Sequence, residues 1–395
     1  MTALTTAGLR AQAERLAATL TRHRRTVHRY PEVGFAEHTT AAYIEVELDR
    51  LGVRHRRVVG TGVVAVVGAG QRCIGVRADM DALPVAEAPG REGYRSENDG
   101  ISHACGHDAH VAIVLGLAEL LAAAPALDGT VALYFQPAEE GPGGGAPMVA
   151  AGVLHDPAPQ AVVSLHVEAE HPTGMIALRA GPSQASDDTV RVLLRGVGGH
   201  AAYPHLATDP LPAAAAVITG VQQLLTREVD PVQPALFTFG SVHGGTRHNV
   251  IAPEVRLEGT LRTLDARNRE LLLVRIPEFI SAVAAAHGVT ADVTVEKGYP
   301  VGVNDPALTD LVEEAARAVV PDAPILREPE PAMGAEDFYE FGSTGLPVTM
   351  FNLGVRNAAK GITGSHHAPD FDLDEDALPV GLAVLAETVR RFLAP

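Results

Sequence analysis

The sequence predicts an α/β fold in which a mixed, mainly parallel sheet carries a smaller, inserted α+β domain of ferredoxin-like type. Its 395 residues exceed one typical core. Strand-like and helix-like segments alternate at both ends of the chain, which favours a parallel sheet covered on both faces. Near residue 185 the strands instead alternate apolar and polar residues, and the order becomes β-α-β-β-α-β. We therefore predict one domain from 1–184 and 298–395, and an inserted domain at 185–297.

The first part of the chain contains three predicted helices. They lie near 6–29, 38–51 and 109–123, with strands near 53–59, 62–67, 73–78, 129–136 and 162–167. Gly52 suits the C-cap of the second helix, and Asp108 is the predicted N-cap of the third. The segment 60–65 matches the nucleotide-binding pattern G-x-G-x-x-A, but the valines that follow form a strand pattern. A turn followed by a strand is the favoured interpretation.

The inserted domain and the last part follow the same logic. For the insertion we predict strands at 189–195, 235–243, 254–264 and 290–296 and helices at 209–228 and 266–287. The last part has predicted helices near 305–320 and 375–393 and a strand at 347–353.

Charge and composition exclude several classes of protein. The net charge of −17 argues against a nucleic-acid partner, which requires a basic surface. Two cysteines are too few for a disulfide scaffold, and no apolar segment has the length of a membrane span. The N-terminus is followed by an amphipathic helix and not by an apolar signal segment. We expect a soluble, cytoplasmic protein without a membrane partner.

The segment 103–110, His-Ala-Cys-Gly-His-Asp-Ala-His, concentrates groups that bind metals. Cys105 and His107 are two residues apart, so that in an extended segment their side chains point the same way. Such a pair alone is more often structural. Other candidates lie at or just after the ends of predicted strands or precede the last helix: Glu139, Glu140, His166, His366 and His367. Because sites in α/β proteins gather at the carboxyl ends of strands, this accumulation predicts a metal site. The residues alone leave open which glutamate is ligand and which is base.

These motifs together resemble one family along nearly the whole chain. They are 77–84, 103–110, 135–145, 165–167, 198–200, 244–251, 334–338 and 367–371. The chain resembles the M20 metallopeptidases in their amidohydrolase branch, which includes hippurate hydrolases, N-acyl-amino-acid amidohydrolases and auxin-conjugate hydrolases. The resemblance implies a two-metal catalytic domain and a smaller lid domain through which two subunits form a homodimer.

The resemblance also implies roles for individual residues. The metal ligands it implies are Cys105, His107, Glu140, His166 and His367. Cys105 would bridge two divalent ions, which could be zinc, manganese, cobalt or nickel. Glu139 would be the general base, and His367 is favoured over His366 by the Ala-Pro-x-Phe that follows it. Asp79 and Asp81 stand where related branches have a metal-binding histidine and its supporting aspartate. We expect them to orient ligands, and we count Asp81 with the catalytic residues.

The implied reaction is hydrolysis of the amide bond of an N-acyl amino acid, with attack by metal-bound hydroxide and Glu139 as base. His200 would act from the partner subunit's lid, while Asn249 and Arg262 would hold the substrate carboxylate. A dipeptidase or aminopeptidase of the same fold, or a non-catalytic conjugate-binding homologue, is the alternative.

Several residues stand outside this scheme. Glu168 and Arg247 depart from the family pattern and bear on substrate choice. His103 is expected to bond to backbone, and His110 to pack or face the cleft rim.

Overall fold

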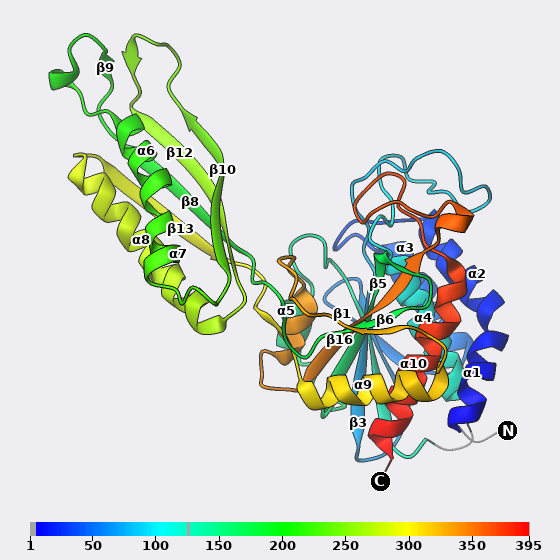
Figure 1. The fold of residues 1–395 in the computed structure, drawn as a ribbon. Helices are drawn as coiled ribbons and strands as arrows, with labels where there is room; N and C mark the ends of the chain where they lie inside the picture. Colours follow the sequence, from blue (N-terminus) through cyan, green and yellow to red (C-terminus); the bar gives the residue numbers. More distant parts are fainter. Residues whose placement is uncertain (1–4, 125–126, 395) are drawn as a thin grey trace. The chain divides into compact units, whose positions relative to one another are not determined.

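The computed structural model describes residues 5–124 and 127–394. Internal contacts divide the chain into two compact units, each described here by itself (Figure 1). The larger unit comprises Met1–Gly181, Val303–Pro329 and Asp337–Pro395. The smaller unit comprises Pro182–Gly302 and Glu330–Glu336. Among the described helices, none is long and apolar enough to cross a membrane.

An eight-stranded mixed sheet forms the centre of the larger unit. In spatial order its strands are β1 (Arg54–Val58), β2 (Gly62–Gly68), β4 (Thr130–Gln136), β3 (Cys73–Asp79), β5 (Val162–Pro172), β16 (Val348–Arg356), β6 (Ile176–Leu178) and β15 (Ile325–Arg327). The central strands β4, β3, β5 and β16 run parallel, and β1, β2 and β6 add antiparallel pairs. The predicted α/β class with a mainly parallel sheet is confirmed.

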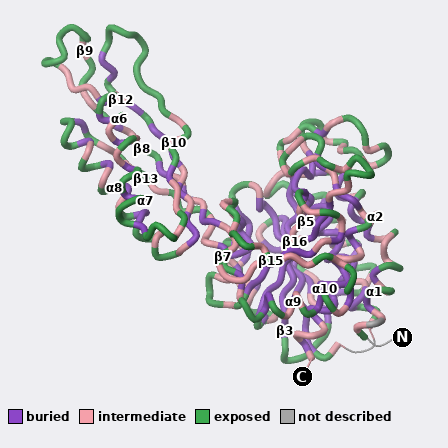
Figure 2. Tube along the Cα trace, viewed as in Figure 1, coloured by how far each residue is buried: buried purple, intermediate pink, exposed green. Residues whose placement is uncertain are grey.

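Alternation along the strands builds a core on each face of this sheet. Val131, Leu133 and Phe135 of β4 face one side, and Ala132 and Tyr134 face the other. The first side is covered by the helices α1 (Thr6–Arg15), α2 (Ala17–Arg29), α3 (His38–Arg50), α4 (His107–Ala122), α9 (Pro306–Val319) and α10 (Leu378–Leu393). The second side is covered by α5 (Gly145–Ala150) and the short helix η2 (Asp337–Gly342). The central strands are accordingly buried along most of their length (Figure 2).

The smaller unit is a four-stranded antiparallel sheet with helices on one face. Its strands follow the spatial order β10 (Ala235–Gly244), β12 (Glu254–Thr263), β8 (Asp188–Arg195) and β13 (Thr290–Lys297). The helices are α6 (Pro210–Gly220), α7 (Gln222–Arg227) and α8 (Ala266–Ala286). Numbered along the unit, the strand order is second, third, first, fourth, as expected for the ferredoxin-like arrangement. Short strands β9 (Gly199–His200) and β11 (Val250–Ile251) pair in its loops.

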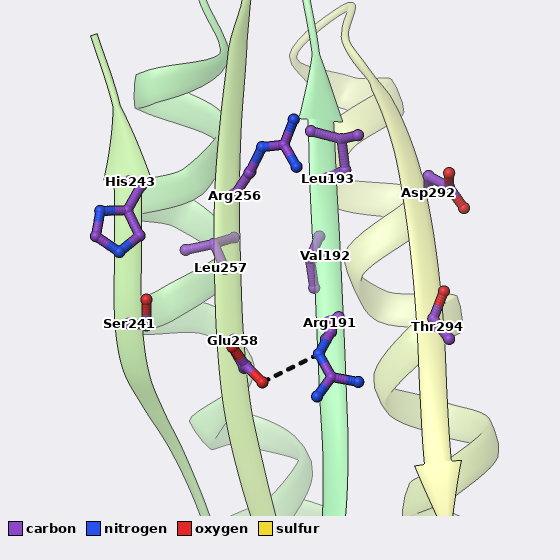
Figure 3. A pocket seen from close by; sticks show the side chains of 10 residues that line it. All are labelled: Arg191, Val192, Leu193, Ser241, His243, Arg256, Leu257, Glu258, Asp292 and Thr294. Atoms are coloured by element: carbon purple, nitrogen blue, oxygen red, sulfur yellow. Dashed lines mark hydrogen bonds and ion pairs between the residues drawn. The ribbon is translucent and has the colours of Figure 1, made fainter. Parts of the chain in front are cut away.

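The second face of this small sheet has no helix over it within the unit and is polar (Figure 3). Arg191 and Glu258 form an ion pair there between neighbouring strands, at 3.0 Å. A shallow depression of about 370 Å³ lies over the same strands and is lined by Leu193, Arg256 and Asp292 among others. Both side chains of this pair are about half exposed, so the pair contributes little to stability.

Some predicted elements are broken or shifted. The first predicted helix is split at Leu16 into α1 and α2, and the helix at 209–228 is split at Val221 into α6 and α7. The prediction that Asp108 is an N-cap is wrong, because Gly106 occupies that position with φ 88°. The nucleotide-like glycine pattern is indeed a turn followed by a strand, β2. Two short strands, β7 (Gly181–Gln184) and β14 (Gly302–Asn304), pair with each other. The short helices η1 (Pro204–Leu206), η3 (Ala358–Lys360) and η4 (Glu375–Ala377) complete the fold of the described residues.

Candidate metal centre and catalytic glutamate

Three neighbouring parallel strands end at the same edge of the large sheet. Asp79 is the last residue of β3, Glu139 and Glu140 follow β4, and His166 lies near the middle of the long strand β5. Since β4, β3 and β5 are adjacent and parallel, their carboxyl ends bring these side chains together. The sequence therefore predicts correctly where this group of polar residues gathers.

The segment that carries Cys105 and His107 enters helix α4 through Gly106. This glycine has a positive φ, and a Cβ on it would lie 2.4 Å from Cγ2 of Val167. Only glycine fits both the conformation and the space. The helix then begins at His107, so that Cys105 and His107 lie on either side of a tight turn beside β5.

The five predicted ligands lie together in the larger unit. Sγ of Cys105 is 3.6 Å from Nε2 of His166, and Oε1 of Glu140 is 3.0 Å from Nε2 of His367. Nε2 of His107 lies 3.9 Å from the same Glu140 oxygen. Cys105 belongs to two compact groups of possible ligands, one with His107 and His166 and one with Glu140 and His367, each within 4.8 Å. One thiol thus stands between two sets of ligand atoms.

The hydrogen bonds of the histidines leave the right nitrogens free for a metal. Nδ1 of His107 donates to the carbonyl oxygen of Asp81 at 3.0 Å, and Nδ1 of His166 donates to that of Val167 at 2.6 Å. In the neutral imidazole, the form that binds a metal, their Nε2 atoms therefore carry the lone pairs. Nε2 of His107 is buried and has no hydrogen-bond partner among residues 5–124 and 127–394. A buried nitrogen without a partner is costly, and a bound cation would satisfy it.

Two of the predicted ligands, Cys105 and His107, have a raised pKa in the metal-free protein. Burial raises the pKa of the Cys105 thiol well above its usual range, and Glu140 and Glu139 raise it further. Burial alone would lower the pKa of His107, but Asp79, Asp81 and Glu140 outweigh it and raise the pKa to about 10. The donor set of one thiol, imidazoles and a carboxylate fits a divalent transition metal.

The loop between β4 and α5 presents the two glutamates, of which Glu139 is buried and Glu140 half-buried. Asp81 fixes this loop because its Oδ1 accepts the backbone N–H of Glu139 at 3.0 Å and its Oδ2 that of Glu140 at 2.9 Å. Oδ1 of Asp81 is also 3.3 Å from Nδ1 of His107. Asp81 therefore positions a ligand and both glutamates through its contacts.

Asp79 belongs to a buried chain of charged groups behind the centre. Nε2 of His110 accepts the N–H of Val167 at 2.9 Å, so its Nδ1 carries the proton and donates to Asp79. The other oxygen of Asp79 accepts from Arg77 at 2.6 Å, and Arg77 also reaches Asp337 at 2.9 Å. Although burial raises the pKa of Asp79, Arg77 and the two histidines hold it well below its usual range.

This chain of groups was missed from the sequence. A signal existed, because Arg77 is the one charged residue inside the apolar segment 73–78, and a buried charge needs a partner. The expectation for His110, packing or facing the cleft rim, omitted both of its hydrogen bonds. The prediction that the His103 ring bonds to backbone is wrong. Within the described part of the chain, its two buried ring nitrogens have no hydrogen-bond partner.

The two adjacent histidines near the C-terminus have different surroundings. Nε2 of His366 accepts the N–H of Ala169 at 3.0 Å, and its ring stacks on Phe371. His367 has φ 61°, and its N–H donates to the carbonyl of Ala104 at 2.8 Å. That hydrogen bond ties the loop to the segment of Cys105, and it is His367 that reaches Glu140.

The remaining predicted site residues all lie in the smaller unit. His200 and Asn249 are exposed on neighbouring loop segments, joined by a hydrogen bond from the Ala201 N–H to the Asn249 carbonyl at 3.1 Å. Arg262, in β12, is half-buried and pairs with Asp187. These three residues are thus not brought to the metal-ligand group within one unit, and their roles stay predictions.

A family model describes the chain from residue 75 to residue 391, under the description peptidase family M20/M25/M40. The chain belongs to the M20 peptidase family. The resemblance found from the sequence motifs is thereby confirmed, and the protein is a hydrolase of the M20 type.

Curated M20 relatives match the chain along almost its full length. The N-acetyldiaminopimelate deacetylase of Exiguobacterium sibiricum is 39% identical over 381 residues, which is 94% of this chain and 98% of the relative. The thermostable carboxypeptidase 1 of Saccharolobus solfataricus is 37% identical over 377 residues, which is 93% and 94% of the two chains.

Among solved M20 structures, a dinuclear metal-binding peptidase from Bacillus subtilis superposes with a TM-score of 0.82. It is 30% identical, and the alignment covers 96% of this chain and 99% of that one. The fold of this chain is thus the fold of a protein described as binding two metals.

Proposed function

We propose that the protein is a metal-dependent amidohydrolase that cleaves the amide bond of an N-acyl amino acid, giving a carboxylate and a free amino acid. The observation that carries the proposal is the gathering of Cys105, His107, Glu140, His166 and His367 around the buried, unpartnered Nε2 of His107, with Glu139 beside them. The deacetylase named among the relatives acts, by its name, on an N-acetylated amino acid and supports this substrate class.

Two divalent ions would be held by these ligands, with Cys105 shared between the two groups described above. Once bound, such ions lower the pKa of water and polarise a carbonyl oxygen. Zinc, cobalt or nickel suits the thiolate, while manganese suits the carboxylate and imidazoles. The dinuclear solved relative supports the number of ions, and the metal itself is a matter for measurement.

Glu139 is the proposed general base. Its carboxylate would accept the proton of the attacking water and then give it to the nitrogen of the leaving amino acid. Asp81 fixes the backbone of Glu139 and so fixes the direction from which that proton is taken. Glu140, whose backbone N–H Asp81 also holds, would remain a ligand and not a proton carrier.

The smaller unit would bind the other end of the substrate. Arg262 suits a bidentate grip on a carboxylate, with Asn249 as a second donor. The Arg262 guanidinium forms an ion pair with Asp187, so a substrate carboxylate would have to displace the Asp187 carboxylate. We also propose a homodimer in which His200 of the partner subunit completes the site. Exposed apolar side chains on the same loops, including Tyr203 and Leu206, support an interface there.

A second candidate, cleavage of a C-terminal residue from a short peptide, is favoured by the carboxypeptidase among the relatives. Both reactions release an amino acid with a free carboxylate. They differ in whether the group on its nitrogen is a simple acyl group or a peptide. A dipeptidase or aminopeptidase would instead need a free α-amine.

The experiment loads the purified protein separately with zinc, manganese, cobalt and nickel. Each form is assayed on N-acetyl and N-benzoyl amino acids, on dipeptides with a free amine and on N-blocked dipeptides. We expect hydrolysis of the N-acyl amino acids and a loss of about 10²–10⁴-fold in kcat for Glu139→Gln. Hydrolysis of none of these substrates, or full activity in Glu139→Gln, would contradict the proposal.

A further inference from the structure

The residue before Glu139 has an unusual backbone. Ala138 has φ 58°, a left-handed conformation that a residue with a Cβ adopts at a cost. Its side chain is buried, and its carbonyl accepts the N–H of Gly143 at 3.0 Å. A residue of this kind keeps its conformation only where its surroundings hold it there.

The N–H groups of three successive residues in this loop point at carboxylates. Those of Glu139 and Glu140 bond to Asp81, as described above. The N–H of Ala138 donates to Oε1 of Glu37, at 2.8 Å. Glu37 therefore fixes the peptide on the N-terminal side of Ala138, while Asp81 fixes the peptide on its C-terminal side.

The Glu37 side chain bonds to Ala138 and not to the helix that Glu37 precedes. It stands at the N-cap of α3, yet its side chain makes no capping hydrogen bond to that helix. Instead Oε2 accepts the hydroxyl of Thr61 at 2.6 Å, and the residue is fully buried. Oε2 of Glu37 is thus bonded to the turn before β2, and Oε1 to the loop that carries the two glutamates.

The segment before Glu37 closes around the same point. A Cβ on Gly34 would lie 2.8 Å from Cβ of Ala138 and 3.6 Å from Oδ2 of Asp81. Val33 forms a bridge with Ala82, directly after Asp81. The segment from Val33 to Glu37 therefore packs against both the aspartate and the glutamate loop.

We infer that Glu37 is a positioning residue for Glu139, acting by holding the N–H of Ala138 so that the left-handed conformation aims the Glu139 carboxylate at the substrate side of the centre. The inference rests on the proposed role of Glu139. Its distinctive feature is that Glu37 acts as a hydrogen-bond acceptor of the right length and not as a charge.

Three variants of the protein distinguish a role as a hydrogen-bond acceptor of the right length from a role as a charge. Glu37→Gln keeps the length, with its amide oxygen for Ala138 and its NH₂ for the Thr61 hydroxyl, which can also accept. Burial raises the pKa of Glu37, which fits a site that tolerates a neutral side chain. Glu37→Asp keeps the acid but withdraws it by one methylene. Thr61→Val removes only the hydrogen bond to Oε2 of Glu37, leaves the bond to Ala138, and is the matched control.

We expect kcat to fall by about 10- to 100-fold in Glu37→Asp, because a misplacement on the order of 1 Å costs that much, with KM within about threefold. Glu37→Gln and Thr61→Val should keep kcat within about threefold of wild type. Crystal structures should show Ala138 at positive φ in the glutamine variant and displaced in the aspartate variant.

The reverse order, with Glu37→Asp active and Glu37→Gln impaired, would overturn the inference, as would an unchanged kcat in the aspartate variant. If the wild type hydrolyses no amide, the proposed function fails but the positioning can still be judged. The crystal structures then decide, and an Ala138 that keeps its positive φ in both Glu37 variants overturns it.

Discussion

Nε2 of His367 lies 3.0 Å from Oε1 of Glu140, although Glu140 precedes the smaller unit in the sequence and His367 follows it. The hydrogen bond from the His367 N–H to Ala104 brings this contact next to Cys105. The candidate centre is therefore assembled from four separate segments, and each contributes a ligand that can be tested by itself.

Removing the shared thiol should lower metal content. In Cys105→Ala we expect fewer than two metal ions per subunit, because both ligand groups lose the same atom. Cys73→Ala is the matched control, since Cys73 is the other buried cysteine and lies in β3 away from the ligands. Elemental analysis after dialysis measures the outcome. Full occupancy in Cys105→Ala would exclude the thiol as a ligand.

Metal binding should release protons and strengthen as the pH rises. At neutral pH the metal-free protein holds a proton on Cys105, whose pKa is well above its usual range, and one on His107, whose pKa is about 10. A metal ion takes the deprotonated ligands, so binding displaces both protons. Titration calorimetry in buffers of different ionisation enthalpy counts them. A binding enthalpy that is the same in every buffer would contradict these protonation states.

Stability should fall in acid through Glu87. Burial raises the pKa of this carboxyl, but hydrogen bonds from His28 and the Ser96 N–H outweigh it and lower the pKa to about 2, from an ordinary value of 4.5. A depressed pKa stabilises the folded state above 4.5, and this contribution is lost as the pH falls from 4.5 through 2.

The test for Glu87 is urea unfolding between pH 6 and pH 2. The decline in stability should be shallower in Glu87→Gln than in the wild type, since the variant has no proton to take up. Glu92→Gln, at an exposed glutamate of the same loop, is the control. Identical pH profiles for wild type and Glu87→Gln would refute the assignment.

Removing Arg77 should be strongly destabilising. Arg77→Met leaves Asp79 and Asp337 buried without their shared cation, which typically costs about 3–5 kcal/mol of unfolding free energy. Arg317→Met removes an exposed cation whose partner, Glu313, keeps a second cation in Arg327, so it should cost less than about 1 kcal/mol. Chemical denaturation measures both. Equal losses in the two variants would mean that burial does not set the difference.

The fold was predictable where a local pattern and a tertiary role coincide. The alternation of strand-like and helix-like segments identified the parallel strands, and the alternation of apolar and polar residues identified β8 of the smaller unit. The predictions failed where a residue far away in the sequence determines what a side chain bonds to. Asp108 reads as a helix cap, but its Oδ2 bonds to Arg24 and His28, and the positive φ of Gly106 starts the helix earlier.

The same limit applies to the candidate site. Cys105, His107 and the two glutamates are recognisable because metal ligands come from few residue types at characteristic spacings. Asp81 is recognisable only through the family resemblance, and Glu37 carries no mark at all, since an acid before a helix is ordinary. The contact of Glu37 is with an N–H group far along the chain, and finding it requires the structure.

The pairing of β5 with β16 has a consequence for how the chain matures on the ribosome. Asn352 of β16 lies opposite His166 of β5, yet the smaller unit is synthesised between them. The residues from Pro182 to Gly302 emerge as one continuous stretch and can fold as soon as they leave the exit tunnel. The edge of β5 stays unpaired until β16, in the last quarter of the chain, has been translated. The proposed ligand set, which includes His367, is therefore complete only after that last part has been translated.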